Sequence, residues 1–132
     1  MKYYWKKKHD KLFVPSEELS GSGYFEFQFY KKDLPAKKAA KDYHRHWLAD
    51  SLYVHIDHQS VFLRNYLPYL QKTTAPDGSC EFCYFAPNYY TKEQAAKMVE
   101  QIRADRPLEW EVLLPWLERA ASEYYGFFVM GV

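Results

Sequence analysis

The side chains of this sequence best suited to chemistry are two cysteines separated by two residues and four histidines in two close pairs. They are Cys80 and Cys83, His44 and His46, and His55 and His58. A cysteine pair with this gap is typical of half a zinc site, and two imidazoles could complete a tetrahedral one. The aromatic neighbours of the cysteines instead favour a strand, which would send the two sulfurs to opposite faces. We therefore expect no bound metal and no cofactor.

The histidines also raise the question of hydrolysis, because imidazole titrates near neutral pH and a carboxylate can orient it. The segment His44-Arg45-His46 resembles only the His-x-His beginning of the metallo-β-lactamase motif. Asp50 follows too far along, and the chain is too short for that fold. No glycine loop of the phosphate-binding kind is present. A small zinc-dependent enzyme is therefore the third hypothesis, and no catalytic residue is assigned.

The chain is rich in aromatic residues, with 13 Tyr, nine Phe and four Trp among 132 residues. One core does not require so many large side chains, and surplus Tyr and Trp contribute strongly to interfaces. The leading hypothesis is therefore a non-enzymatic protein-binding module. One specific form of it is an inhibitor or immunity protein that neutralises a bacterial toxin. The chain is similar in general style to toxin-immunity proteins, although no motif supports a family.

The formal net charge of +1 conceals an uneven distribution. Residues 1–45 contain eleven Lys or Arg and six acidic residues, whereas residues 46–132 contain seven and eleven. In the basic half, Lys37, Lys41 and Arg45 lie at helical spacing and could meet phosphates. Nucleic-acid binding is therefore the second hypothesis. The alternative is that these residues form a solvated helix face.

In the acidic half, carboxylates surround tryptophans near the C-terminal end. The predicted binding residues are Trp110, Glu109, Glu111 and Glu118. Acidic side chains around an aromatic anchor suit a protein partner with a basic surface. The alternative is that Trp110 and Trp116 fill the core while the acids solvate a helix. Trp116 is expected to be the more buried of the two.

Three further expectations follow from the composition. Two cysteines are too few for a disulfide framework, no apolar stretch reaches membrane length, and the N-terminal Lys6-Lys7-Lys8 run does not suit a signal peptide. We expect a cytoplasmic protein that does not bind membranes. Its length is typical of a single domain, which we place over residues 1–132.

Short apolar or alternating segments predict strands at residues 3–5, 12–14, 24–30, 51–57, 80–85 and 124–130. Phe25, Phe27 and Phe29 share one face of the third of these, which we expect to be core. In residues 51–57, the inward side chains are expected to be Leu52, Val54 and Ile56. Strands and helices alternate irregularly, which favours an α+β fold with a mostly antiparallel sheet and three or four packed helices.

Helical spacing of apolar residues predicts the helices. The first spans residues 33–50 and buries Ala36, Ala39, Ala40, Tyr43 and Trp47. The second buries Phe62, Leu63, Tyr66, Leu67 and Leu70, with Pro68 expected to bend or shorten it. The third begins at a capping box of Thr91 and Gln94 and buries Ala95, Val99 and Ile102. After Pro107, a helix with Leu108, Val112, Trp116 and Ala120 inward competes with a strand, and Pro115 disfavours an unbroken helix.

Overall fold

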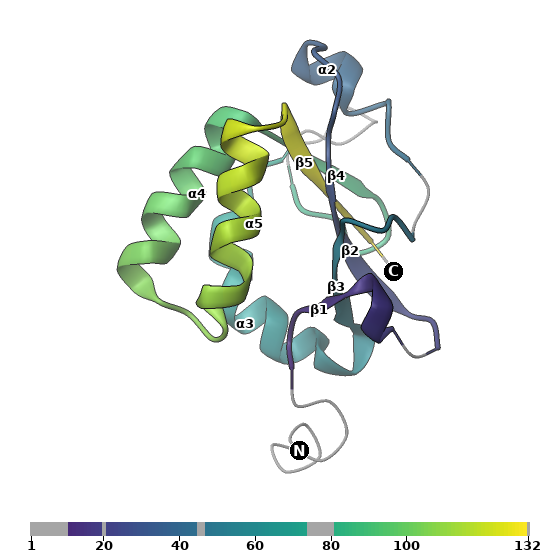
Figure 1. The fold of residues 1–132 in the computed structure, drawn as a ribbon, viewed down its shortest axis with the longest axis vertical. Coiled ribbons are helices and arrows are strands. Elements are labelled where there is room, and N and C mark those ends of the chain that lie inside the picture. The colour runs from purple at the N-terminus through teal and green to yellow at the C-terminus, as the bar shows by residue number, and fades with distance from the viewer. Residues whose placement is uncertain (1–10, 20, 45–46, 74–80, 132) are drawn as a thin grey trace.

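A computed structural model describes residues 11–19, 21–44, 47–73 and 81–131. Its strands are β1 (Val14–Pro15), β2 (Tyr24–Phe29), β3 (Leu52–His55), β4 (Pro87–Thr91) and β5 (Gly126–Met130). Its helices are α2 (Ala36–Ala39), α3 (Gln59–Leu70), α4 (Lys92–Asp105) and α5 (Trp110–Ser122), with 3₁₀ turns η1 (Ser16–Glu18) and η2 (Ile56–His58). The predicted α+β fold with an antiparallel sheet is confirmed (Figure 1).

The strand nearest the C-terminal end lies inside the sheet. The order is β1-β3-β2-β5-β4, and β5 pairs antiparallel with both β2 and β4. Gly126 begins β5 with a φ of +123°, and a Cβ atom there would lie 2.3 Å from the carbonyl oxygen of Tyr90. Only glycine tolerates both this backbone angle and this close approach. The entry of β5 between its neighbours therefore depends on Gly126.

One face of the sheet is covered by α3, α4 and α5 (Figure 1). The alternation of β2 places Phe25, Phe27 and Phe29 on this face, as predicted, and all three are buried. Trp116 stacks on Phe29 with ring centroids 4.1 Å apart, and its indole N–H donates to the carbonyl of Asp50 at 3.0 Å. Trp116 is thus a core residue whose polar atom is satisfied.

The other face of the sheet, which we call the second face, is covered by α2 and the segment that follows it (Figure 1). A smaller buried cluster lies there, made of Tyr30, Ala39, Ala40, Tyr89, Phe128 and Met130. The strands therefore bury aromatic side chains on both faces. Much of the aromatic surplus seen in the sequence is used in this way.

The third predicted helix is confirmed as α4. The hydroxyl of Thr91 accepts from the N–H of Gln94 at 3.1 Å, and the Gln94 side chain accepts from the N–H of Thr91 at 2.9 Å. This reciprocal pair satisfies two backbone donors that helix geometry leaves without partners. Ala95, Val99 and Ile102 are buried as expected.

The prediction of a helix over residues 33–50 is wrong. Among residues 33–44 and 47–50, helical structure is confined to the single turn α2, whose N-cap is Pro35 rather than Asp33. Ala39 and Ala40 are buried, but Tyr43 and Trp47 are half exposed. Trp47 has a φ of 81°, which no helix allows. Long-range contacts of this segment therefore override its local helical pattern.

Three other local predictions need correction. Residues 81–86 form a bridge at Glu81 followed by a loop, and the strand begins later, as β4; Cys80 lies outside the described residues. Ile56 is exposed because β3 ends before it and η2 begins. The helical alternative is right for α5, which continues through Pro115. Trp116 and Ala120 are buried as expected, whereas Val112 is exposed and Leu108 lies exposed before the helix begins.

The buried residues of α3 are Phe62, Tyr66 and Leu70, while Leu63 and Leu67 are half-buried. The helix continues two residues beyond Pro68. Each helix in the described part of the chain is too short or too polar to cross a lipid bilayer.

Candidate functional site

Glu109, a predicted binding residue, has its carboxylate engaged within the protein. It accepts from the backbone N–H of Leu12 at 2.7 Å and of Phe13 at 3.2 Å. Its own backbone is left-handed, with a φ of 57°. Glu109 therefore fixes the chain that enters β1 against the start of α5.

The other predicted binding residues lie along α5 with different surroundings. Trp110 is partly buried against the core, and the guanidinium of Arg106 lies 5.5 Å from its ring centroid. Glu118 forms a 2.6 Å ion pair with Arg103 of α4. Glu111 is exposed. These positions share one helix, and their role in binding remains a prediction.

The second face carries an exposed aromatic pair that the sequence did not reveal. Trp47 is 51% exposed and Tyr43 is 49% exposed. The indole of Trp47 stacks on buried Tyr53 with centroids 5.8 Å apart, while Tyr43 lies edge-on to buried Phe128 at 6.5 Å. We call Tyr43 and Trp47, with the rings beneath them, the aromatic surface.

A buried carboxylate holds the Trp47 end of this surface in place. Glu26 of β2 is fully buried on the second face and accepts from the N–H of Trp47 at 2.6 Å and of Leu48 at 3.0 Å. It also accepts from the Ser51 hydroxyl at 2.7 Å. Charge-assisted bonds of this kind are stronger than neutral ones. An acid between Phe25 and Phe27 is the sequence signal that could have revealed this anchor.

A cavity of about 380 Å³, the second-face cavity, lies beside Tyr43. Its lining includes Tyr30, Tyr43, Phe128 and Leu48, with the charged residues Lys31, Lys32 and Asp42. The Tyr30 hydroxyl donates to Asp42 at 2.8 Å, and this bond, followed by one from Lys32, lowers the pKa of the Asp42 carboxyl. Asp42 is therefore ionised at neutral pH.

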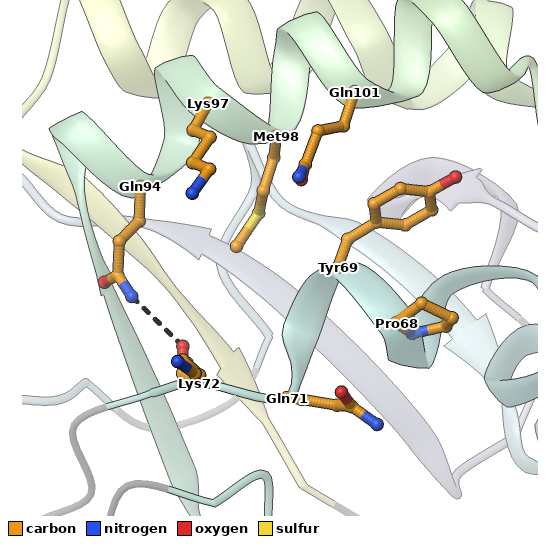
Figure 2. A pocket seen from close by; sticks show the side chains of 8 residues that line it. All are labelled: Pro68, Tyr69, Gln71, Lys72, Gln94, Lys97, Met98 and Gln101. Carbon is orange, nitrogen blue, oxygen red and sulfur yellow. Dashed lines mark hydrogen bonds between the residues drawn. The ribbon is translucent and has the colours of Figure 1, made fainter.

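A second cavity, of about 280 Å³, lies between the end of α3 and α4 (Figure 2). Its lining residues are Pro68, Tyr69, Gln71, Lys72, Gln94, Lys97, Met98 and Gln101. Lys97, Met98 and Gln101 extend from α4 toward the α3 side, and the Gln94 amide donates to the carbonyl of Lys72 at 3.1 Å (Figure 2). This polar groove carries two lysines and no acidic residue, and it lacks the exposed rings of the aromatic surface.

Of the residues considered for catalysis or metal binding, His55 and His58 lie near each other, with ring centroids 6.3 Å apart, and the carboxylate of Asp57 lies 3.5 Å from Nδ1 of His55. Cys80 and His46 lie outside the described residues, and the backbone of Cys83 is held by the amide of Asn88. His55 accepts from the N–H of Asp57 through Nδ1 at 3.0 Å. Within the described ranges, no group of three or more His, Cys, Asp or Glu side chains is arranged to hold a metal ion.

No family model, curated protein or solved structure matches this chain. Function is therefore inferred from the surfaces described above. Two of them combine apolar and charged groups: the aromatic surface with the second-face cavity, and the start of α5. On the aromatic surface the rings of Trp47 and Tyr43 are more exposed than that of Trp110, and the backbone of Trp47 is held by the buried Glu26.

Proposed function

We propose that this protein is a non-enzymatic protein-binding module that uses the aromatic surface. The observation that carries the proposal is the half-exposed position of Trp47 and Tyr43 above a buried aromatic layer. Trp and Tyr are the residues most enriched among those that dominate binding energy. Their apolar bodies remain partly in water in the isolated chain, so a partner that covers them gains apolar burial.

The Glu26 contacts support this role. They fix the backbone at Trp47 and Leu48, so that less conformational freedom is lost on binding than for a free loop. The left-handed backbone of Trp47 is unusual for a bulky residue, and such geometry persists only where its surroundings impose it. A side chain held in this way is suited to act as an anchor.

The test begins with affinity capture from the native host, followed by binding kinetics with the purified partner. Trp47→Ala should weaken binding at least tenfold, mainly through faster dissociation, while the thermal midpoint stays close to that of wild type. Phe85→Ala is the matched control because Phe85 is 80% exposed, and the ring that it contacts is Tyr84 rather than a ring of the aromatic surface. Equal affinity of wild type and a folded Trp47→Ala variant would refute the aromatic surface as the binding site.

A specific form of the proposal is an inhibitor or immunity protein that neutralises a bacterial toxin. Its support is the single small domain with an aromatic binding surface and an uneven charge distribution. The test is co-expression with a toxin encoded beside this gene. Wild type should restore growth, and Trp47→Ala should restore it less well. Growth arrest in the presence of well-expressed wild-type protein would rule out that toxin as the target.

A second candidate function is nucleic-acid binding, which one observation favours. Lys37, Lys38 and Lys41 are exposed, and none forms an ion pair with another described residue. They precede the exposed ring of Tyr43 in the sequence. Cations beside an aromatic ring on which bases can stack are suited to binding single-stranded nucleic acid. Replacing the three lysines with Gln should then weaken RNA or DNA retention across sequences and reduce its salt dependence. Retention unchanged by the triple replacement would exclude this site.

A further inference from the structure

The second-face cavity has an apolar interior beside the aromatic surface. Phe128 and Tyr30 are buried at its wall, Leu48 is half-buried, and Tyr43 stands half exposed beside it. Its volume of about 380 Å³ is near the lower end of the range for ligand pockets, roughly 300 to 1,000 Å³. A pocket of this kind is suited to a single large apolar side chain of a partner.

The acidic residues around the cavity are paired with lysines, and further lysines nearby have no acidic partner among the described residues. Asp42 is engaged by the Tyr30 hydroxyl and by Lys32 at 3.3 Å, and Asp50 is engaged by Lys31 at 2.6 Å. The backbone N–H of Asp42 bonds to the carbonyl of Ala39, so the turn after α2 leads directly into the cavity wall.

That turn and α2 carry the excess charge. Lys37, Lys38 and Lys41 are exposed and have no ion-pair partner in the part of the chain that the structure describes. These three lysines do not line the cavity itself, but they lie on α2 and on the turn that leads to Asp42 in its wall, where they outnumber the nearby exposed acid Asp33. Electrostatic complementarity requires a ligand that brings carboxylates to the side of the cavity next to α2.

We propose that the second-face cavity binds an apolar side chain of the protein partner that is flanked by Asp or Glu residues. This inference rests on the proposed protein-binding function and specifies the partner segment. A peptide fits better than a nucleic acid for two reasons. The cavity wall formed by Phe128, Tyr30 and Leu48 is apolar and suits a large apolar side chain, and the chain as a whole has a formal net charge of only +1.

Site-specific photocrosslinking tests the proposal. Tyr43→p-benzoylphenylalanine places the probe at the cavity, and Val112→p-benzoylphenylalanine places a matched probe on the exposed side of α5. Each full-length variant is irradiated in extracts of the native host, and the crosslinked segment is identified by mass spectrometry. A synthetic peptide of the segment crosslinked at Tyr43 is then titrated against wild type and against Lys37→Glu/Lys38→Glu/Lys41→Glu.

The expected result is a crosslink at Tyr43 to a segment that contains an apolar residue flanked by acids. Its peptide should bind the triple Lys→Glu variant at least tenfold more weakly. A protein crosslinked only at Val112 would overturn the inference and leave a protein-binding function open. A basic segment or a nucleic acid crosslinked at Tyr43 would also overturn it. Equal peptide affinity for both proteins would also overturn it. No crosslinked protein at either position would contradict the proposed function itself.

Discussion

The backbone N–H of Trp47 donates to the buried carboxylate of Glu26 at 2.6 Å, joining the exposed loop to the centre of the sheet. Glu26→Gln should destabilise the fold, because one carboxylate oxygen becomes an amide group that faces N–H and O–H donors. Buried donors left without acceptors cost about 1–3 kcal/mol, and more for bonds to charged groups. We therefore expect a loss of about 2–4 kcal/mol in the free energy of unfolding, measured with denaturant.

The control for Glu26→Gln is Glu100→Gln, which makes the same chemical change on the exposed side of α4. That substitution should change the free energy of unfolding by less than about 0.5 kcal/mol. Equal stabilities of the two variants would show that the carboxylate does not hold the loop.

Arg106 ends α4 in the left-handed region, with a φ of 52° and a ψ of 57°. A non-glycine residue costs about 1–2 kcal/mol in this conformation, whereas glycine adopts it freely. Arg106→Gly and Arg106→Ala both remove the contact of the guanidinium with Trp110, so their difference isolates the backbone. The glycine variant should be more stable by about 1 kcal/mol in thermal or denaturant unfolding. A more stable alanine variant would contradict the left-handed helix end.

Buried tyrosines predict a loss of stability at alkaline pH. Burial raises the pKa of Tyr89 to about 12, and burial followed by the hydrogen bond to Asp105 raises the pKa of Tyr69 to about 12. Burial also raises the pKa of Tyr66 and of Tyr90. Unfolded tyrosine has a pKa of about 10, so this contribution is fully present below pH 10. It is lost as the pH rises from 10 through 12, because the unfolded state releases protons that the folded state retains.

Tyrosinate absorbance and circular dichroism should follow this transition together. For the tyrosines that remain protonated in the fold, ionisation should coincide with unfolding above pH 10. Ionisation of all 13 tyrosines near pH 10 with the fold intact would contradict the burial described above.

The α5 surface is predicted to bind a partner with a basic surface, and its charged and apolar roles should be separable. Glu111→Lys/Glu118→Lys should slow association and change its salt dependence, whereas Trp110→Ala should speed dissociation and cost about 2 kcal/mol or more. Glu109 is left unchanged because its carboxylate holds Leu12 and Phe13. Surface plasmon resonance with the captured partner measures both rates.

Trp116→Ala serves as the comparison for Trp110→Ala. Trp116 is buried, so its truncation should reduce the free energy of unfolding by about 3–5 kcal/mol. If Trp110→Ala destabilises the domain as much as Trp116→Ala does, α5 is not the binding surface. The same holds if both folded surface variants bind the partner like wild type.

The elements that could be predicted from the sequence are those specified by neighbouring residues. Thr91 and Gln94 form their capping box within one helical turn, and Phe25, Phe27 and Phe29 alternate within one strand. In each case the required partners lie within a few positions, so local spacing is sufficient.

The incorrect predictions involve partners far apart in the sequence. Local spacing favoured a helix through Trp47, but Glu26, 21 positions earlier, binds its backbone N–H instead. The bond between the Glu109 carboxylate and the N–H of Leu12, 97 positions away, likewise cannot be seen in local spacing, and the binding role of Glu109 stays a prediction. The aromatic surface was missed for the same reason, because no local pattern distinguishes an exposed Trp47 from a buried one.

The internal position of β5 has a consequence for synthesis of the protein. Until residues 126–130 leave the ribosome, β2 and β4 each lack the strand that completes their hydrogen bonding. The nascent chain then presents two open strand edges with aromatic side chains on both sides, which is a surface prone to misassociation. The sheet can therefore close only after β5 has emerged, and chaperones that bind extended apolar segments can act on the chain before then.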